Sequence, residues 1–244
     1  MSELDKLDAL THLAGAVAHE LNNIFTAVNG NLSLLEMAFE DAGTNTQIVN
    51  DVLRTTRRGL ELSEKLQAFA GQQKLSRALV DLNDVTRSTI AELKQSVLKG
   101  LEVEVTLENR RCLASTDEKK LRQVIEELAR NAAAAMDPGG WIIFATGRYS
   151  PADAEAGTLP GGEYAYISVR DCGHGMSPAV TQRALDPLFS TRRGHHGWGL
   201  ARCAGFVRQC GGKMTLNSVE GRGTEATVYL PLSPENRATS AAVA

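Results

Sequence analysis

The chain contains 244 residues, 43% hydrophobic and 23% charged, which is the composition of one or two globular domains. This composition excludes collagen-like, disulfide-scaffolded and wholly disordered chains. The formal net charge of −3 gives no bulk electrostatic basis for binding nucleic acid or an anionic membrane. No stretch approaches the roughly 18 consecutive apolar residues of a membrane span. We therefore expect a cytoplasmic protein with no membrane span and no nucleic-acid partner.

The chain has four cysteines, at Cys112, Cys172, Cys203 and Cys210. They form no CxxC pair and show no conventional zinc spacing. In a cytoplasmic chain this pattern predicts reduced thiols, and it argues against a metal site built on cysteine.

Two amphipathic helices are predicted in the N-terminal part of the chain. Apolar residues recur at steps of three and four from Leu4 to Phe39, and a second such pattern covers 49–69. The polar stretch 40–46 between them indicates a turn. Two isolated helices would expose their apolar stripes to water, so we predict an antiparallel hairpin that forms a four-helix bundle with a second chain. This dimerisation domain would cover residues 1–73 of a homodimer.

From about residue 77 to residue 232, short β-type runs alternate with helical patterns, which predicts a separate α/β domain. The expected strands are 101–107, 112–116, 141–147, 164–170, 213–219 and 223–230. The expected helices are 83–99, 117–136, 177–185 and 199–210. Residues 149–163 indicate a surface insertion, and residues 233–244 indicate a flexible tail.

A polar cluster lies on the first predicted helix. His19 is two residues from both Val17 and Leu21, which places it about 200° around the helix from the apolar stripe. Glu20 follows His19 directly, and Asn23 lies one helical turn further on. An imidazole can act as a nucleophile while a carboxylate takes its proton and an amide orients water, so the cluster suits phosphoryl transfer. A solvated surface histidine is the alternative interpretation.

The α/β domain carries two candidate nucleotide-binding motifs. Asn131 follows Glu127 by four residues, so both project from one helix face and could hold a hydrated Mg²⁺. Asp171 ends a predicted strand and is followed by Gly173 and Gly175. Its carboxylate could accept a hydrogen bond from an exocyclic amine, and the glycines allow close backbone approach to a flat base. A capping asparagine and a plain turn are the alternative interpretations of these two motifs.

Two further motifs follow along the chain. Gly194, Gly197 and Gly199 precede a predicted helix that begins near Leu200, and backbone N–H groups at a helix N-terminus suit phosphate binding. The alternative is a flexible surface loop. Thr224 precedes the last predicted strand, where its hydroxyl could join a water network around a base. The alternative there is a simple hairpin turn.

The run Ala18-His19-Glu20-Leu21-Asn22-Asn23 resembles the H box of sensor histidine kinases. The Asn131 motif, the Asp171 motif, the run Pro187–Thr191 and the glycines up to Gly199 resemble, in order and spacing, the N, G1, F and G2 boxes of their ATP-binding domain. That domain has the Bergerat fold shared with gyrase, Hsp90 and MutL. The resemblance covers residues from about 10 to 232 and is closest to the cores of hybrid histidine kinases. It implies an α+β chain with a helical hairpin followed by an α/β-sandwich ATP-binding domain.

The resemblance implies an ATP-dependent protein histidine kinase of a two-component system. His19 would be the phosphoacceptor and Glu20 its acid/base partner. The phosphoryl group would pass to an aspartate of a response-regulator receiver domain, and Asn23 would position water when that regulator is dephosphorylated. The stimulus would come from a separate sensor or activating partner.

For the ATP-binding domain the resemblance implies ATP and Mg²⁺ as cofactors. Asn131 would bind Mg²⁺, Asp171 would bind the adenine amine, and the segment 194–199 would bind phosphates within a mobile lid. Two positions depart from the family. Glu127 replaces the usual first asparagine of the N box, as in the Bergerat ATPases, which implies some ATP hydrolysis. The run His195-His196-Gly197-Trp198 lacks one glycine of the lid.

Two other functions remain open. A histidine phosphotransfer or docking protein would relay phosphate through His19 without using ATP, and the intact Asn131 and Asp171 motifs argue against it. A Bergerat ATPase acting as a conformational clamp would hydrolyse ATP without forming phosphohistidine, and the early His19 run argues against that. A metal site at His195 and His196 is disfavoured, because no carboxylate or thiolate set lies near them in the sequence.

Overall fold

The computed structural model describes residues 21, 23–26, 28–35, 37, 49–56, 59, 75–150, 159, 161–186, 189–192 and 197–237. The chain divides into two compact units, Met1–Gln73 and Lys74–Ala244, and each is treated by itself. Within the described ranges, no helix is both long enough and apolar enough to cross a bilayer.

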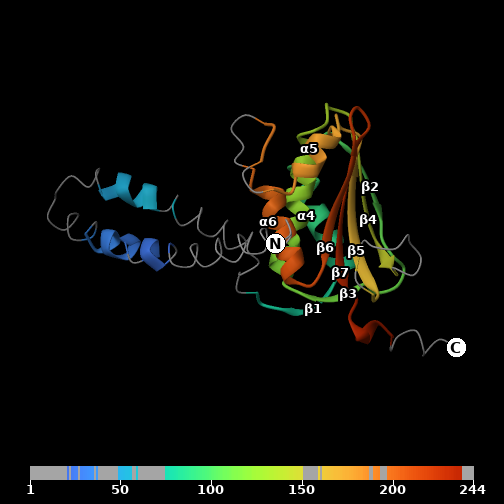
Figure 1. The fold of residues 1–244 in the computed structure, drawn as a ribbon, viewed down its shortest axis with the longest axis horizontal. Helices are drawn as coiled ribbons and strands as arrows, with labels where there is room; N and C mark the ends of the chain where they lie inside the picture. Colours follow the sequence, from blue (N-terminus) through green and yellow to red (C-terminus); the bar gives the residue numbers. More distant parts are fainter. Residues whose placement is uncertain are drawn as a thin grey trace, which may run out of the picture. The chain divides into compact units, whose positions relative to one another are not determined.

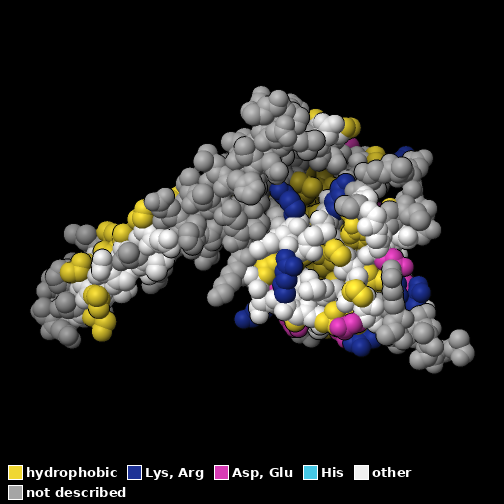
Figure 2. Space-filling view, turned by 60° about the horizontal axis from the view of Figure 1, so that its bottom comes forward, with side chains coloured by type: hydrophobic (Ala, Val, Ile, Leu, Met, Phe, Trp, Pro, Cys, Tyr) yellow, Lys and Arg dark blue, Asp and Glu magenta, His cyan; other side chains and the backbone are white. Residues whose placement is uncertain are grey.

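Every described residue of the first unit is helical. Gly59 lies against the Phe25 ring, because a Cβ added at Gly59 would come within 2.4 Å of the Phe25 Cζ atom. Apolar side chains are visible on the surface of this unit (Figure 2), and Ile24, Leu34 and Met37 are 52%, 66% and 63% exposed. A single copy of the chain therefore leaves apolar helix surface in contact with water. The predicted dimeric hairpin stays a prediction.

The second unit is built on a five-stranded sheet (Figure 1). Its strands, in spatial order, are β2 (Glu102–Thr106), β4 (Trp141–Tyr149), β5 (Tyr164–Asp171), β7 (Gly223–Pro231) and β6 (Lys213–Val219). The β2–β4 pair is parallel and the other three pairs are antiparallel. A separate two-stranded antiparallel sheet pairs β1 (Ala78–Asp81) with β3 (Leu113–Thr116).

The helices of this unit cover one face of the sheet, as Figure 1 shows for α4 and α6. They are α3 (Leu82–Leu93), α4 (Glu118–Ala133), α5 (Pro178–Arg183) and α6 (Gly199–Gln209). Asp117 caps α4 by accepting the Lys120 N–H at 3.1 Å. Its second carboxylate oxygen accepts the Ser76 N–H at 2.9 Å. The start of α4 is therefore tied to the point where the chain enters this unit.

The core lies between the helices and the sheet. Side chains alternate along each strand, so every second residue points toward the helices. The residues of this layer that are at most 2% exposed include Ile142, Phe144, Ile167, Val169, Val228 and Leu230 from the strands and Leu121, Ile125, Phe206 and Val207 from the helices. Asp171 continues the inward set of Ile167 and Val169, so the alternation carries a carboxylate to the end of the buried face.

The six predicted strands are confirmed to within two residues at each end. The strand β1 was not predicted, because its four residues gain their partner only through β3. The helix predicted over 83–99 ends at Leu93 and is followed by turns. The beginning of the expected tail is held in place, since the Ser233 N–H donates to the Leu113 carbonyl at 2.8 Å and Pro234–Arg237 forms a 3-10 turn (η2). Most of the expected 149–163 insertion lies outside the described residues.

The Thr86 side chain in α3 provides a test of the core. Thr86 is fully buried, and its Oγ1 has no hydrogen-bond partner within the part of the chain that the structure describes. We expect Thr86→Val to raise the free energy of unfolding by about 1 kcal/mol, because valine has the same shape and no hydroxyl to desolvate. Urea denaturation of the two proteins measures the difference.

Thr89→Val is the matched control for this prediction. Thr89 is equally buried in the same helix, but its hydroxyl donates to the Val85 carbonyl at 2.7 Å. We expect no gain in stability from this second substitution, because a hydrogen bond is lost. Equal effects of the two substitutions would contradict the assignment of Thr86 as the unsatisfied hydroxyl.

Candidate functional site

The first part of the site is a buried carboxylate at the end of β5. Asp171 is 5% exposed. Its Oδ1 accepts the N–H of Gly173 at 2.8 Å and the N–H of Thr224 at 3.2 Å. Burial raises the pKa of Asp171, and these two backbone donors oppose the rise. A carboxylate oriented through Oδ1 can use its other oxygen to accept a hydrogen bond from a ligand amine.

Close backbone contacts hold the loop that follows Asp171. A Cβ added at Gly175, where φ is +62°, would lie 2.0 Å from the Val219 carbonyl oxygen. A Cβ added at Gly223, where φ is +95°, would lie 1.9 Å from the Asp171 carbonyl oxygen. A Cβ added at Gly173 would likewise lie 2.5 Å from the Ala135 carbonyl oxygen. These glycines are therefore needed for backbone packing within the protein itself, in addition to any approach of a base.

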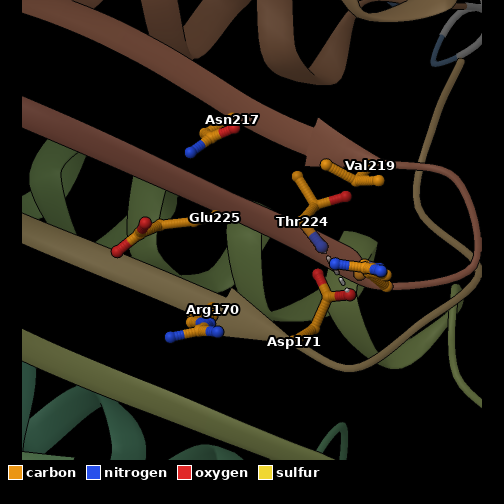
Figure 3. A pocket seen from close by; sticks show the side chains of 8 residues that line it. Arg170, Asp171, Asn217, Val219, Thr224 and Glu225 are labelled. Carbon is orange, nitrogen blue, oxygen red and sulfur yellow. Dashed lines mark hydrogen bonds between the residues drawn. The ribbon is translucent and has the colours of Figure 1, made fainter.

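A cavity of about 310 Å³ opens where β5 and β6 end and β7 begins (Figure 3). Besides Asp171 and Thr224, its lining includes Arg170, Asn217 and Glu225. The sequence reasoning missed these last three residues. They are neighbours across three strands, in the pairs Arg170↔Glu225 and Asn217↔Glu225, and strand order cannot be read from spacing along the chain. By the strand alternation they lie on the face of the sheet away from the helices, whereas the Asp171 side chain continues the buried face.

Thr224 contributes to the site through both its side chain and its main chain. Its hydroxyl lies 2.9 Å from the Ser218 Oγ, on the neighbouring strand. Its backbone N–H is the group that reaches the Asp171 carboxylate. Thr224 therefore supports Asp171 directly through its main chain, a function that no side-chain pattern indicates.

The second part of the site lies where α4 meets the start of α6. The Asn131 Nδ2 donates to the Glu127 Oε1 at 3.3 Å. The other oxygen, Oε2, lies 3.6 Å from the Arg202 guanidinium. Gly199, the first residue of α6, is so close that a Cβ there would lie 1.9 Å from the Glu127 Oε1. Three of the predicted residues are thus brought together, and Arg202 joins them.

The start of α6 receives no side-chain cap from its own N-cap residue. Its N-cap residue, Trp198, makes no side-chain capping hydrogen bond, and its first turn holds no acidic residue. Gly197 precedes it with φ at +66°, while Leu200 packs partly against the core. An uncapped helix N-terminus next to an amide and a carboxylate suits a phosphate group with its cation. Arg192, also missed from the sequence, donates to the Asn131 carbonyl at 3.2 Å.

The remaining predicted residues fall outside these two clusters. His19, Glu20, Gly194, His195 and His196 lie outside the described residues. Asn23 is helical and exposed in the first unit. Within the described residues, no group of three or more histidine, cysteine or acidic side chains could hold a metal ion. The four cysteines are free thiols, as predicted.

The raised pKa of Asp171 predicts a pH-dependent stability. Ionisation is disfavoured in the folded chain, so the wild type loses stability as pH rises from 3.8 through the raised pKa. We expect Asp171→Asn to be more stable at pH 7, because Asn Oδ1 can still accept both N–H groups without a charge to desolvate. The gain should vanish below pH 3.8. Urea unfolding of both proteins between about pH 3.5 and 7 measures it, and a pH-independent difference would contradict this explanation.

The contact of Gly199 with Glu127 predicts a second effect on stability. In Gly199→Ala the new methyl group would displace the Glu127 carboxylate from Asn131 and Arg202. We expect the free energy of unfolding to fall by no more than about 1 kcal/mol, because the atoms in the way belong to the end of a flexible side chain and alanine is the better helix former. Adding Glu127→Ala should recover the loss because it removes the displaced carboxylate. A Gly199→Ala variant as stable as the wild type would show that the Glu127 carboxylate can leave Asn131 and Arg202 without cost.

Comparison with known proteins agrees with this arrangement. The family model of histidine kinase-, DNA gyrase B- and HSP90-like ATPases matches residues 116–234. Sensor kinase CckA of Brucella abortus (strain 2308) is 31% identical over 254 residues, which cover 100% of this chain and 26% of that protein. Sporulation kinase C of Bacillus subtilis (strain 168) is 27% identical over 236 residues, covering 96% and 52%. The crystal structure of full-length ShkA in complex with AMPPNP matches with a TM-score of 0.59 and 22% identity, covering 91% of this chain and 46% of that one.

The chain spans 26% and 52% of the lengths of these two curated relatives. The matched segment 116–234 contains both clusters described above, the one around Asp171 and the one around Asn131. The structural likeness extends to the mixed α/β fold of that segment. Residues 116–234 therefore match the ATP-binding domain of the histidine kinase-, DNA gyrase B- and HSP90-like ATPases, and the curated relatives of the chain include kinases.

Proposed function

We propose that the protein is a two-component histidine kinase that uses ATP and Mg²⁺ to phosphorylate itself on His19 and then passes the phosphoryl group to an aspartate of a response-regulator receiver domain. The observation that carries this proposal is the pairing of Asn131 and Glu127 against the uncapped start of α6, in the same domain as the buried Asp171 carboxylate. The Asn131 cluster suits phosphates with their cation, and the Asp171 carboxylate suits an adenine amine.

Asp171 would orient the base. Its Oδ1 is held by two backbone N–H groups, so the carboxylate cannot rotate freely. The adenine amine would donate to it, and the low exposure of Asp171 would strengthen that hydrogen bond by excluding water. Specificity for adenine follows, because a carboxylate accepts from an amine and repels a carbonyl oxygen at the same place.

Asn131 would hold Mg²⁺, and its surroundings fit that function. Because its Nδ2 donates to Glu127, its Oδ1 is the atom that remains for a cation. Mg²⁺ would neutralise charge on the phosphates. The first N–H groups of α6 would donate to phosphate oxygens, and Gly199 keeps this helix end close to Glu127.

His19 would attack the γ-phosphorus with one ring nitrogen. The bond from phosphorus to the bridging β–γ oxygen breaks, ADP leaves, and Glu20 takes the proton from the other ring nitrogen. Asn23, which is exposed on its helix, would orient water when the regulator is dephosphorylated. Phosphatase activity is thus part of the proposal.

A second copy of the chain would complete the first unit. Ile24, Leu34 and Met37 are all more than half exposed in one chain, and a four-helix bundle of two hairpins over residues 1–73 would bury such surface. The receiver domain would dock on the bundle surface near His19. The ATP-binding domain would span residues 77–232, and a separate sensor or activating partner would supply the stimulus.

The kinase proposal predicts covalent labelling of the chain. Purified protein incubated with γ-labelled ATP and Mg²⁺ should acquire acid-labile, base-stable label, because phosphohistidine has that stability. His19→Ala should lose the label because the acceptor is gone, and Asn131→Ala should lose most of it because the cation is held poorly. His12→Ala is the matched control and should label like the wild type. Autoradiography after alkaline denaturing electrophoresis measures the label.

Two outcomes would contradict the proposal. Label that persists in His19→Ala would place the acceptor elsewhere. An unlabelled wild type that also fails to bind AMPPNP would favour a phosphotransfer or docking protein, in which His19 relays phosphate from another kinase. Release of inorganic phosphate without label would instead favour an ATPase.

A further inference from the structure

Arg202 and Asn131 share one carboxylate. The Glu127 Oε2 lies 3.6 Å from the Arg202 guanidinium, which comes from α6. The Glu127 Oε1 accepts from Asn131, on the same helix α4, at 3.3 Å. The Glu127 side chain is 23% exposed and that of Arg202 is 41% exposed. The carboxylate is thus partly withdrawn from water, and a guanidinium balances its charge.

The position of Arg202 is set by the start of α6. The Arg202 N–H donates to the Trp198 carbonyl at 2.9 Å, which places the residue in the first helical turn. No acidic residue in that turn competes for the guanidinium. One turn earlier, Gly199 leaves no space for a side chain between α6 and Glu127. The helix end proposed to receive phosphates therefore also brings a cation to Glu127.

A divalent cation on Asn131 would change this balance. Mg²⁺ is a compact charge that prefers carboxylate and carbonyl oxygens, whereas a guanidinium is large and weakly hydrated. Glu127 is hydrogen-bonded to Asn131, so a cation held by Asn131 would compete with Arg202 for the same carboxylate. The two cations would also repel each other in this partly buried place.

We propose that Arg202 is an exchangeable counterion of Glu127. It neutralises the carboxylate while the cation site is empty and releases it when Mg²⁺ and nucleotide bind. This inference rests on the proposed assignment of Mg²⁺ to Asn131. Arg202 is a positioning residue in this scheme, and it sets the Mg²⁺ concentration that the protein needs to bind nucleotide.

A Mg²⁺ titration tests the exchange without measuring kinase activity. The full chain is mixed with N-methylanthraniloyl-ADP at a fixed concentration, and its fluorescence is followed as Mg²⁺ is added. We expect Arg202→Gln to lower the Mg²⁺ concentration at half-maximal binding by roughly threefold or more, because no cation has to be displaced. Arg208 is exposed in the last turn of the same helix, so Arg208→Gln removes the same charge far from Glu127 and should leave the midpoint unchanged.

Further variants separate exchange from a merely structural ion pair. In a Glu127→Gln background, Arg202→Gln should cause no additional shift, because there is no carboxylate to compete for. Arg202→Lys keeps the charge, so it should keep a midpoint near that of the wild type and serves if Arg202→Gln fails to fold. A wild-type midpoint in folded Arg202→Gln would overturn the exchange.

The same titration distinguishes this inference from the proposed function. Nucleotide binding that does not depend on Mg²⁺ in the wild type, or that keeps its dependence in Asn131→Ala, would overturn the assignment of Asn131. Mg²⁺-dependent binding that Asn131→Ala loses, together with equal midpoints for the wild type and Arg202→Gln, would overturn the exchange alone.

Discussion

The packing of one helical layer on one face of the sheet determines where the residues of the candidate nucleotide site lie. Leu121 and Ile125 of α4 and Phe206 of α6 are buried in the same core, and burial of such side chains contributes about 1.5–3 kcal/mol each. Glu127 and Asn131 lie along α4 at the edge of that apolar contact, where α6 begins. Apolar burial thus fixes the two helices, and the polar cluster follows from their placement.

Asp171 shows a compensation between strand geometry and electrostatics. The alternation along β5 directs its side chain to the buried face, which disfavours its charge. The N–H of Thr224, from β7, and the N–H of Gly173 reduce that cost. The carboxylate is therefore kept in place by backbone donors from two separate segments, and Gly223 permits their approach by having no side chain.

Much of this site could be predicted from local pattern. Period-two runs predicted the strands, and the four-residue spacing of Glu127 and Asn131 predicted that they share a helix face, because those signals are short-range. Only the family resemblance linked these two residues to Asp171. Arg202, Arg192 and the Arg170 neighbourhood could not be predicted, because each depends on contacts between segments far apart in the chain. The same reason explains why β1, with four residues, was missed.

The charges of Glu127 and Arg202 depend on each other. An amide at position 127 would carry no charge, whereas Glu127 places a carboxylate where only 23% of its side chain reaches water. A partly buried carboxylate without a counterion is costly. Arg202, reaching across from α6, supplies that counterion and at the same time joins the helix that begins at Gly199 to the helix that carries Asn131. In the proposed exchange, the charge of Glu127 would make the position of α6 sensitive to whichever cation neutralises it.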